Sequence, residues 1–226
     1  MNRNERMEKF LNVDLYPVTC EELSAGRSNL DVLAAVIQGG AKIIQLREKD
    51  YSTRDLYRLA LRFRELTATA GVLLIINDRL DIALAVAADG VHLGQDDLPL
   101  PVARELAPEI LIGISTHTLD EALEAQRNGA DYINIGPIFP TKTKKGVERF
   151  LGPHAIASIK ERIEIPFTVM GGINETNINE AVEQGAHRVA VVTAVTKAPD
   201  IAEAVRSLRE KINAPTRRHA LSYINT

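Results

Sequence analysis

Residues 127–133 read Arg127-Asn128-Gly129-Ala130-Asp131-Tyr132-Ile133, in which a glycine and an alanine separate a helix-like segment from an apolar one. The same order recurs at 38–44 and 183–189, and a looser copy lies at 87–93. Glycine directly after a helix ends it, because glycine readily takes the left-handed conformation of a C-terminal cap. The repeat therefore predicts a chain made of successive helix–strand units.

Strand and helix signals alternate along the chain. Ser52 with Asp55, and Thr118 with Glu121, resemble capping boxes that open helices. Short apolar segments with the character of strands lie near 15–19, 42–46, 72–76, 90–93, 110–114, 132–135, 167–170 and 189–192. Eight alternating units predict a parallel sheet, and eight is the number of strands that closes into a (β/α)8 TIM barrel.

An open doubly wound sheet is the alternative fold. Such sheets usually have fewer strands, and no Gly-x-Gly-x-x-Gly turn follows the first strand here. We expect one α/β domain, with residues 15–213 forming the barrel. Residues 1–14 are then an N-terminal extension and 214–226 a C-terminal tail, both expected to be peripheral.

The composition limits the class of protein. Hydrophobic residues make up 45% of the chain and aromatic residues only 4%, so aliphatic side chains must fill the core. With a net charge of −3 and no long basic run, binding to nucleic acid is not expected. No apolar stretch is long enough to span a membrane, and a single cysteine excludes an internal disulfide. We expect a cytoplasmic protein that has no membrane partner.

Catalytic groups of such barrels gather at the carboxyl ends of the strands. Asp78 and Asp97 follow neighbouring strands, so their carboxylates can converge on a divalent cation such as Mg²⁺. Helix N-caps are the alternative interpretation of both residues. Asp81 and Asp96 are weaker candidates for the same role.

Basic residues also follow the strands. Arg47 and Lys49 come directly after the second strand, and Lys144 lies in the long loop after the sixth. Such cations suit a diphosphate beside a metal ion. The alternative is a solvated loop in which Glu48 forms local salt bridges.

A third group can bind a monophosphate. Gly171-Gly172 follows the seventh strand and Val192-Thr193 the eighth, which is where these barrels usually hold a phosphate. A tight turn at the two glycines would be compatible with that role, and Thr141 and Thr143 can add hydroxyl donors. His92 is expected to be a hydrogen-bonded core histidine, and His117 remains open. Cys20 has no activating partner in the sequence and is expected to be a small buried residue.

Taken together, the motifs resemble the thiamine-phosphate synthase family. The resemblance covers about residues 15–208, and its motifs are Gln45-Leu46-Arg47-Glu48-Lys49, Asn77-Asp78, Gly90-Val91-His92-Leu93-Gly94-Gln95-Asp96-Asp97, Gly113-Ile114-Ser115-Thr116-His117-Thr118, Gly136-Pro137-Ile138-Phe139-Pro140-Thr141-Lys142-Thr143-Lys144-Lys145 and Gly171-Gly172-Ile173. The family more often has Ile-Ser or Val-Ser where this chain has Val192-Thr193, and threonine keeps the hydroxyl. An acidic residue or glycine is more usual at Cys20.

The resemblance implies a (β/α)8 barrel enzyme of thiamine biosynthesis with two substrates. These are the diphosphate of 4-amino-5-hydroxymethyl-2-methylpyrimidine, called the pyrimidine diphosphate below, and a thiazole phosphate, carboxylated or not. It implies Mg²⁺ ligation by Asp78 and Asp97. Pyrimidine diphosphate contacts are implied for Gln45, Arg47, Lys49, Asn77, Ser115 and Lys144, of which Arg47, Lys49, Ser115 and Lys144 are the catalytic candidates. Thiazole phosphate contacts are implied for Thr141, Thr143, Gly172, Val192 and Thr193.

Other functions remain open at this point. A thiazole tautomerase of the same fold would not need the full diphosphate set. A phosphate-binding isomerase would need a clear acid–base pair, and a non-catalytic sensor of thiamine precursors would not need both carboxylates. The sequence leaves the oligomeric state open, with a homo-oligomer as one possibility.

Overall fold

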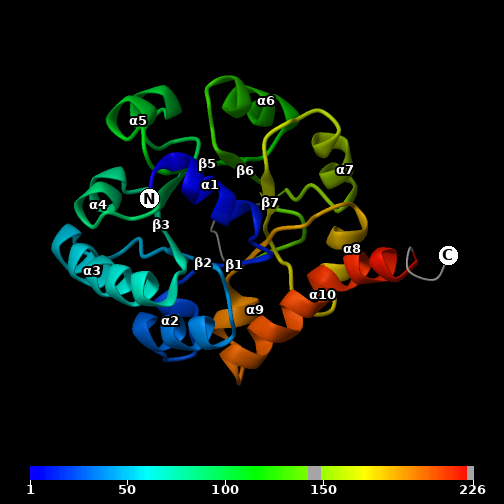
Figure 1. The fold of residues 1–226 in the computed structure, drawn as a ribbon, viewed down its shortest axis with the longest axis horizontal. Coiled ribbons are helices and arrows are strands. Elements are labelled where there is room, and N and C mark those ends of the chain that lie inside the picture. Colours follow the sequence, from blue (N-terminus) through cyan, green and yellow to red (C-terminus); the bar gives the residue numbers. More distant parts are fainter. Residues whose placement is uncertain (142–148, 223–226) are drawn as a thin grey trace.

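The computed structural model describes residues 1–141 and 149–222. Strands and helices alternate along the chain (Figure 1). The elements in chain order are α1 (Arg3–Leu11), β1 (Leu15–Pro17), the 3-10 helix η1 (Glu21–Leu23), α2 (Asn29–Gln38), β2 (Ile43–Leu46), α3 (Thr53–Ala70), β3 (Leu73–Asn77), α4 (Leu80–Ala85), β4 (Gly90–Leu93), α5 (Leu100–Leu106), β5 (Leu111–Thr116), α6 (Leu119–Arg127), β6 (Tyr132–Ile135), α7 (His154–Lys160), β7 (Phe167–Val169), α8 (Ile178–Glu183), β8 (Val189–Val191), α9 (Thr193–Thr196) and α10 (Ile201–Ser222).

All eight predicted strands are present and form one parallel sheet. Its order is β1-β8-β7-β6-β5-β4-β3-β2, so β1 and β2 are the two outer strands of this order, and a barrel closes only where these two strands pair. A parallel bridge joins Val18 to Gln45, and the N–H of Thr19 donates to the carbonyl of Gln45 at 2.9 Å. The sheet is therefore a barrel with helices around it, which confirms the predicted TIM barrel and excludes the open doubly wound sheet.

The predicted helix signals act as caps. Ser52 Oγ accepts the N–H of Asp55 at the start of α3, and Thr118 Oγ1 accepts the N–H of Glu121 at the start of α6. Gly71 ends α3 with φ of 70°, the left-handed conformation expected after a helix.

Side chains alternate between two cores, because successive residues of a strand point to opposite faces. The larger core lies between strands and helices and includes Ile44, Leu46 and Ile112. The smaller core fills the barrel and includes Tyr16, Tyr132 and aliphatic residues. Polar residues at inward-facing strand positions therefore point into the barrel interior.

The N-terminal segment is not peripheral, although its polar composition predicts that it should be. Helix α1 lies across the middle of the barrel in Figure 1, where it covers the end at which the strands begin. Its Phe10 is fully buried, with its ring centroid 4.3 Å from that of Tyr132. Arg188 Nη2 fixes the helix end by donating to the carbonyl of Leu11 at 2.8 Å.

At the other end of the chain, α10 continues across the predicted boundary between 213 and 214. The predicted domain limits of 15 and 213 therefore stay a prediction.

Among the described residues, no helix combines the length and the apolar composition that a membrane crossing requires.

Candidate active site

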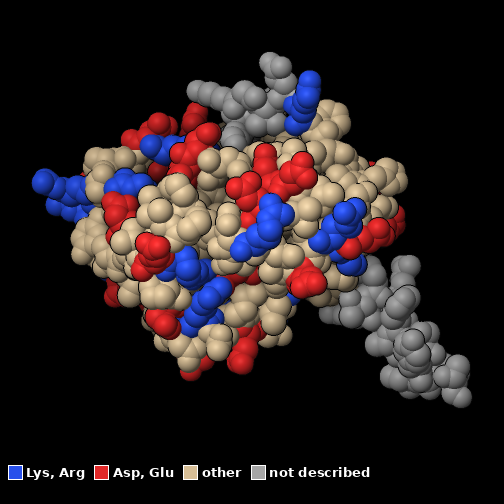
Figure 2. All heavy atoms as spheres, turned by 90° about the horizontal axis from the view of Figure 1, so that it is seen from above, with Lys and Arg blue, Asp and Glu red and all other residues tan. Residues whose placement is uncertain are grey.

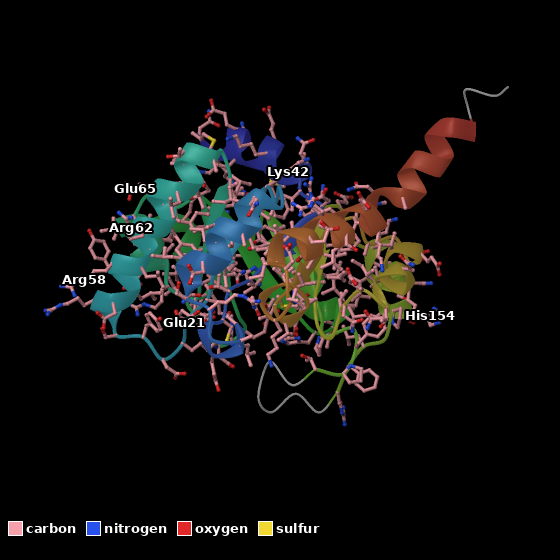
Figure 3. All side chains as sticks on the ribbon, turned by 90° about the horizontal axis from the view of Figure 1, so that it is seen from below. Glu21, Lys42, Arg58, Arg62, Glu65 and His154 are labelled. Carbon is pink, nitrogen blue, oxygen red and sulfur yellow. The ribbon has the colours of Figure 1, made fainter. Side chains whose placement is uncertain are left out.

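The predicted site residues that the structure describes lie at the end of the barrel opposite α1. Figure 3 allows the two ends to be told apart. Glu21 follows β1 and marks the end where the strands finish, and Lys42 precedes β2 and marks the end where they begin. The carboxyl ends of the strands and the loops that follow them form what we call the rim. Thr143 and Lys144 lie outside the described residues.

Two carboxylates of the rim face each other. Asp78 follows β3, and its backbone takes a left-handed φ of 61° while its N–H donates to the carbonyl of His92 at 2.8 Å. Burial raises the pKa of Asp78, and a hydrogen bond and charge from Asp97 raise this pKa further. Lys49 opposes the shift, with Nζ 3.4 Å from Asp78 Oδ2. A like-charged pair of this kind suits a divalent cation.

The alternative that these residues are helix N-caps is wrong. The N-cap of α4 is Arg79 and that of α5 is Pro99, and neither makes a side-chain capping bond. Asp97 Oδ2 instead accepts the N–H of Gly94 at 2.6 Å within the loop after β4.

The metal-binding capacity of the rim rests on these two carboxylates. Among the side chains of residues 1–141 and 149–214, no group of three or more His, Cys, Asp and Glu is placed to hold a metal. Mg²⁺ is commonly held by one or two carboxylates together with water and substrate phosphates, so the pair fits Mg²⁺ and does not fit a closed protein cage.

The loop after β2 holds Arg47 and Lys49. The N–H of Arg47 donates to Thr19 Oγ1 at 3.0 Å, which ties this loop to the end of β1. Glu48 Oε1 accepts the N–H of Glu21 at 2.9 Å, also across to the loop after β1. The salt bridge of Lys49 goes to Asp78, so local pairing through Glu48 does not account for this lysine.

The loops after β7 and β8 form a backbone cradle. Gly171 and Gly172 have φ of 107° and 64°, and the N–H of Phe139 donates to the carbonyl of Gly171 at 2.9 Å. After β8, Val192 is the N-cap of the short helix α9 and Thr193 is its first residue. The first N–H groups of a helix have no carbonyl one turn earlier and can bind an anion. Two glycines and a short extra helix are the usual phosphate site of these barrels.

Two predicted contacts of the pyrimidine diphosphate connect to the barrel interior. Gln45, which is 5% exposed, donates from Nε2 to Tyr16 Oη at 3.0 Å. Ser115 Oγ lies 2.9 Å from Nε2 of His92, which confirms His92 as a hydrogen-bonded core histidine. Burial lowers the pKa of His92 to about 4, so its imidazole is neutral near pH 7. Asn77 is paired with His92 in the register of β3 and β4.

Sequence reasoning missed Tyr16 and Tyr132, whose hydroxyls meet at 2.9 Å inside the barrel. Both are aromatic residues in strands. The only sequence signal for them is that they occupy inward-facing strand positions, as Gln45 and His92 do.

The structure also shows the surroundings of His117 and Cys20. His117 Nδ1 bonds the carbonyl of Gly136 at 2.6 Å, which gives it a structural role. Cys20 is buried, and burial raises the pKa of its thiol, which keeps the thiol protonated.

A separate pocket of about 290 Å³ lies at the opposite end, near α1. Its lining includes Asp14, Lys42 and Arg188 and none of the predicted site residues. The rim is the better candidate site, because it combines facing carboxylates, basic side chains and a glycine cradle.

Comparisons with known proteins show the family of this chain. A family model described as thiamine monophosphate synthase matches residues 15–195. A thiamine-phosphate synthase of Chloroflexus aurantiacus is 48% identical over 88% of this chain and 92% of its own length. One of Pelotomaculum thermopropionicum is 46% identical over 94% of this chain and 98% of its own. A solved structure titled thiamine phosphate pyrophosphorylase from Pyrococcus furiosus is 38% identical, with a TM-score of 0.84 over 92% of this chain and 98% of that one. This chain belongs to the thiamine monophosphate synthase family.

Proposed function

We propose that this enzyme condenses the pyrimidine diphosphate with a thiazole phosphate to give thiamine phosphate and diphosphate, with Mg²⁺ held by Asp78 and Asp97. The observation that carries the proposal is the facing carboxylate pair with Lys49 beside it, on the same rim as the Gly171-Gly172 cradle. The pair and the lysine suit the diphosphate, and the cradle suits the monophosphate.

The chemistry is a dissociative substitution. The bond between the pyrimidine methylene carbon and its oxygen breaks, and the electron pair leaves with the diphosphate. The electron-rich aminopyrimidine carries the resulting methylene cation. The lone pair of the thiazole nitrogen then forms the new carbon–nitrogen bond. No protein nucleophile is required, so the protein mainly positions the reactants and stabilises charge.

Bound Mg²⁺ supplies Lewis-acid stabilisation of the negative charge on the departing diphosphate. The chain's own cations support the same charge. Lys49 lies at the carboxylate pair, and Arg47 is held at the rim by the bond from its N–H to Thr19. Ser115 and, by family resemblance, Lys144 complete the catalytic set, while Gln45 and Asn77 hold the pyrimidine.

The second substrate needs an anchor that holds its nitrogen toward the methylene carbon. Gly172, Val192 and Thr193 provide backbone N–H groups and the hydroxyl of Thr193, at the start of α9. Thr141 and Thr143 are assigned to the same phosphate by resemblance. An anchored nucleophile attacks at high effective concentration.

The direct test is incubation of the purified chain with both substrates and Mg²⁺, followed by chromatographic detection of thiamine phosphate. We expect product and diphosphate in equal amounts, and neither when one substrate or the metal is left out. Interconversion of thiazole tautomers without condensation would instead identify a tautomerase. Binding of both substrates without any turnover would identify a sensor.

A matched pair of variants tests the metal carboxylates. Asp97→Asn should reduce turnover roughly 10²-fold, the order of magnitude seen when one charge-stabilising group is removed from an active site. Asp96→Asn is the control, because Asp96 is the exposed neighbour in the same loop. Turnover in both variants across a Mg²⁺ titration is the measurement. Equal turnover in the two variants would remove Asp97 from the metal site.

The remaining expectations have their own tests. Acidic and basic side chains are interspersed on the face shown in Figure 2. Self-association into a homo-oligomer is tested by light scattering, and the cytoplasmic location by cell fractionation. Limited proteolysis tests the proposed domain limits of 15–213.

A further inference from the structure

Five side chains from five strands form one chain of hydrogen bonds through the barrel. Gln45 Nε2 donates to Tyr16 Oη at 3.0 Å, and Tyr16 Oη lies 2.9 Å from Tyr132 Oη. Tyr132 Oη lies 3.2 Å from Nδ1 of His92, whose Nε2 lies 2.9 Å from Ser115 Oγ. The first four residues are at most 7% exposed, so water is largely excluded from this chain, and the rim is reached at Ser115.

The donors and acceptors fix the direction of the chain. Because Gln45 donates to Tyr16, the Tyr16 hydroxyl is free to donate to Tyr132, and Tyr132 can then donate to Nδ1 of His92. A neutral imidazole carries one N–H, which in this arrangement sits on Nε2 and donates to Ser115 Oγ. The hydroxyl proton of Ser115 is then left to donate into the rim.

The opposite direction leaves one group unsatisfied. If Ser115 donated to His92 and Nδ1 donated to Tyr132, the Tyr16 hydroxyl would accept from both Tyr132 and Gln45. Its own proton would then have no acceptor among the side chains of residues 1–141 and 149–214. A buried unsatisfied hydroxyl is unfavourable, so the direction that ends at Ser115 is preferred.

The packing around Tyr132 shows that its hydroxyl is held in place. The Phe10 ring of α1 lies 4.3 Å from the Tyr132 ring, centroid to centroid. Tyr132 also packs on Gly113, where an added Cβ would come within 2.5 Å of the Tyr132 hydroxyl oxygen. Because residue 113 is glycine, the Tyr132 ring can lie where its hydroxyl contacts His92.

We infer that Tyr16 and Tyr132 are positioning residues that hold His92 as its Nε2–H tautomer, so that Ser115 presents its hydroxyl proton to the departing diphosphate. The inference rests on the proposed function, because that function places the diphosphate at Ser115. It also connects the two ends of one substrate, since Gln45 is proposed to hold the pyrimidine.

Nitrogen-15 NMR of the histidine-labelled full chain gives a readout that does not depend on activity. We expect the wild type to show His92 protonated on Nε2, with the signal assigned by its loss in His92→Gln. Tyr132→Phe removes the donor to Nδ1 and should give a mixture of tautomers. A wild-type His92 protonated on Nδ1 would overturn the inference.

Kinetics test whether the tyrosine acts through Ser115. Tyr132→Phe should lower kcat roughly 5- to 20-fold with little change in the KM of the pyrimidine diphosphate, less than the 10²- to 10³-fold seen when a charge-stabilising donor is lost outright. In a Ser115→Ala background, the same substitution should have no further effect on kcat. Tyr16→Phe should act in the same direction as Tyr132→Phe.

Tyr57→Phe is the matched control, because Tyr57 lies on the outer helix α3 and is 37% exposed. Unchanged kcat in Tyr132→Phe, or equal losses of kcat in the wild-type and Ser115→Ala backgrounds, would contradict the inference. Failure of the proposed function looks different: the wild type would make no thiamine phosphate while the tautomer measurement still stood.

Discussion

At the scale of single residues, Gly172 is the clearest case of a position that only one residue type can fill. Its φ is 64°, and an added Cβ would collide with the carbonyl oxygen of Pro140 and come within 2.9 Å of Phe139 Cβ. Gly172→Ala must therefore move the loop after β7 or the loop after β6. We expect the KM of the thiazole phosphate to rise about tenfold or more, because a displaced anchor loses well-oriented contacts.

The control for Gly172→Ala is Gly152→Ala. Gly152 has a similar φ of 75°, but an added Cβ there meets nothing within 4 Å. The two variants share the backbone penalty of about 1 kcal/mol for a left-handed alanine, and only Gly172→Ala adds the collision. Steady-state kinetics with varied thiazole phosphate, together with thermal unfolding, separate the two effects. Equal KM values in the two variants would contradict a phosphate role for Gly172.

The residues of the rim were predictable to different degrees. Asp78 stands directly after β3, and Asp97 and Gly172 lie in the loops that follow β4 and β7, so their place at the rim follows from the strand pattern. The hydrogen-bonded chain from Gln45 to Ser115 was not predictable, because it joins residues up to 116 positions apart whose hydroxyls meet only after the barrel closes. Side-chain alternation assigns such residues to the interior without giving their partners.

At the scale of elements, a partly buried ion pair joins the start of the first strand to the last helix. Asp14, just before β1, accepts from Arg209 Nε of α10 at 2.9 Å and from Asn213 Nδ2 at 3.0 Å. Burial alone would raise the pKa of Asp14, but the hydrogen bonds from Arg209, Asn213 and the N–H of Leu15, together with the charge of Arg209, outweigh burial and lower it below the ordinary 3.8. The pair therefore stabilises the fold when Asp14 is ionised.

The pH dependence follows from the lowered pKa. The stabilisation is present above the unfolded-state pKa of 3.8 and is lost as the pH falls through the lower folded-state value. Asp14→Asn should reduce the free energy of unfolding by about 1–3 kcal/mol at pH 7, and the difference from wild type should shrink below pH about 3.8. Urea unfolding at pH 7, 5 and 3 measures this.

Glu203→Gln is the control for the Asp14 pair. It removes an exposed ion pair on the same helix, in which Arg206 Nη2 lies 2.9 Å from Glu203 Oε2. Exposed pairs contribute about 0–1 kcal/mol, so a small change is expected. A difference between wild type and Asp14→Asn that stayed constant down to pH 3 would show that the lost stability does not come from the carboxylate charge.

At the scale of the whole molecule, the barrel was predictable because its signals are local and repeated. Every unit carries its own apolar strand and several carry a glycine helix stop, and the observed strands differ from the expected ones by at most two residues at either end. The position of α1 was not predictable. Residues 3–11 are mostly polar, and their three apolar residues, Met7, Phe10 and Leu11, span little more than one helical turn, which is too short a pattern to indicate a buried face.

Phe10 nevertheless connects the closed end of the barrel to its chemistry. It is fully buried against Tyr132, the central member of the chain that ends at Ser115. Phe10→Ala should lower the free energy of unfolding by about 3–5 kcal/mol, as expected for a large buried aromatic side chain. The freed space beside the Tyr132 ring should also lower kcat, although residue 10 lies at the opposite end of the barrel from the substrates.

Leu11→Ala separates these effects from a general loosening of α1, because Leu11 is the adjacent residue and is 49% exposed. Denaturant unfolding and kcat are measured for both variants at a temperature where each is fully folded. The expected result is a large loss of stability and a reduced kcat for Phe10→Ala, with both quantities near wild type for Leu11→Ala. A stable Phe10→Ala protein would mean that α1 is dispensable for the fold. A destabilised Phe10→Ala protein with full kcat would mean that the hydrogen bonds from Gln45 to Ser115 keep their geometry without support from α1.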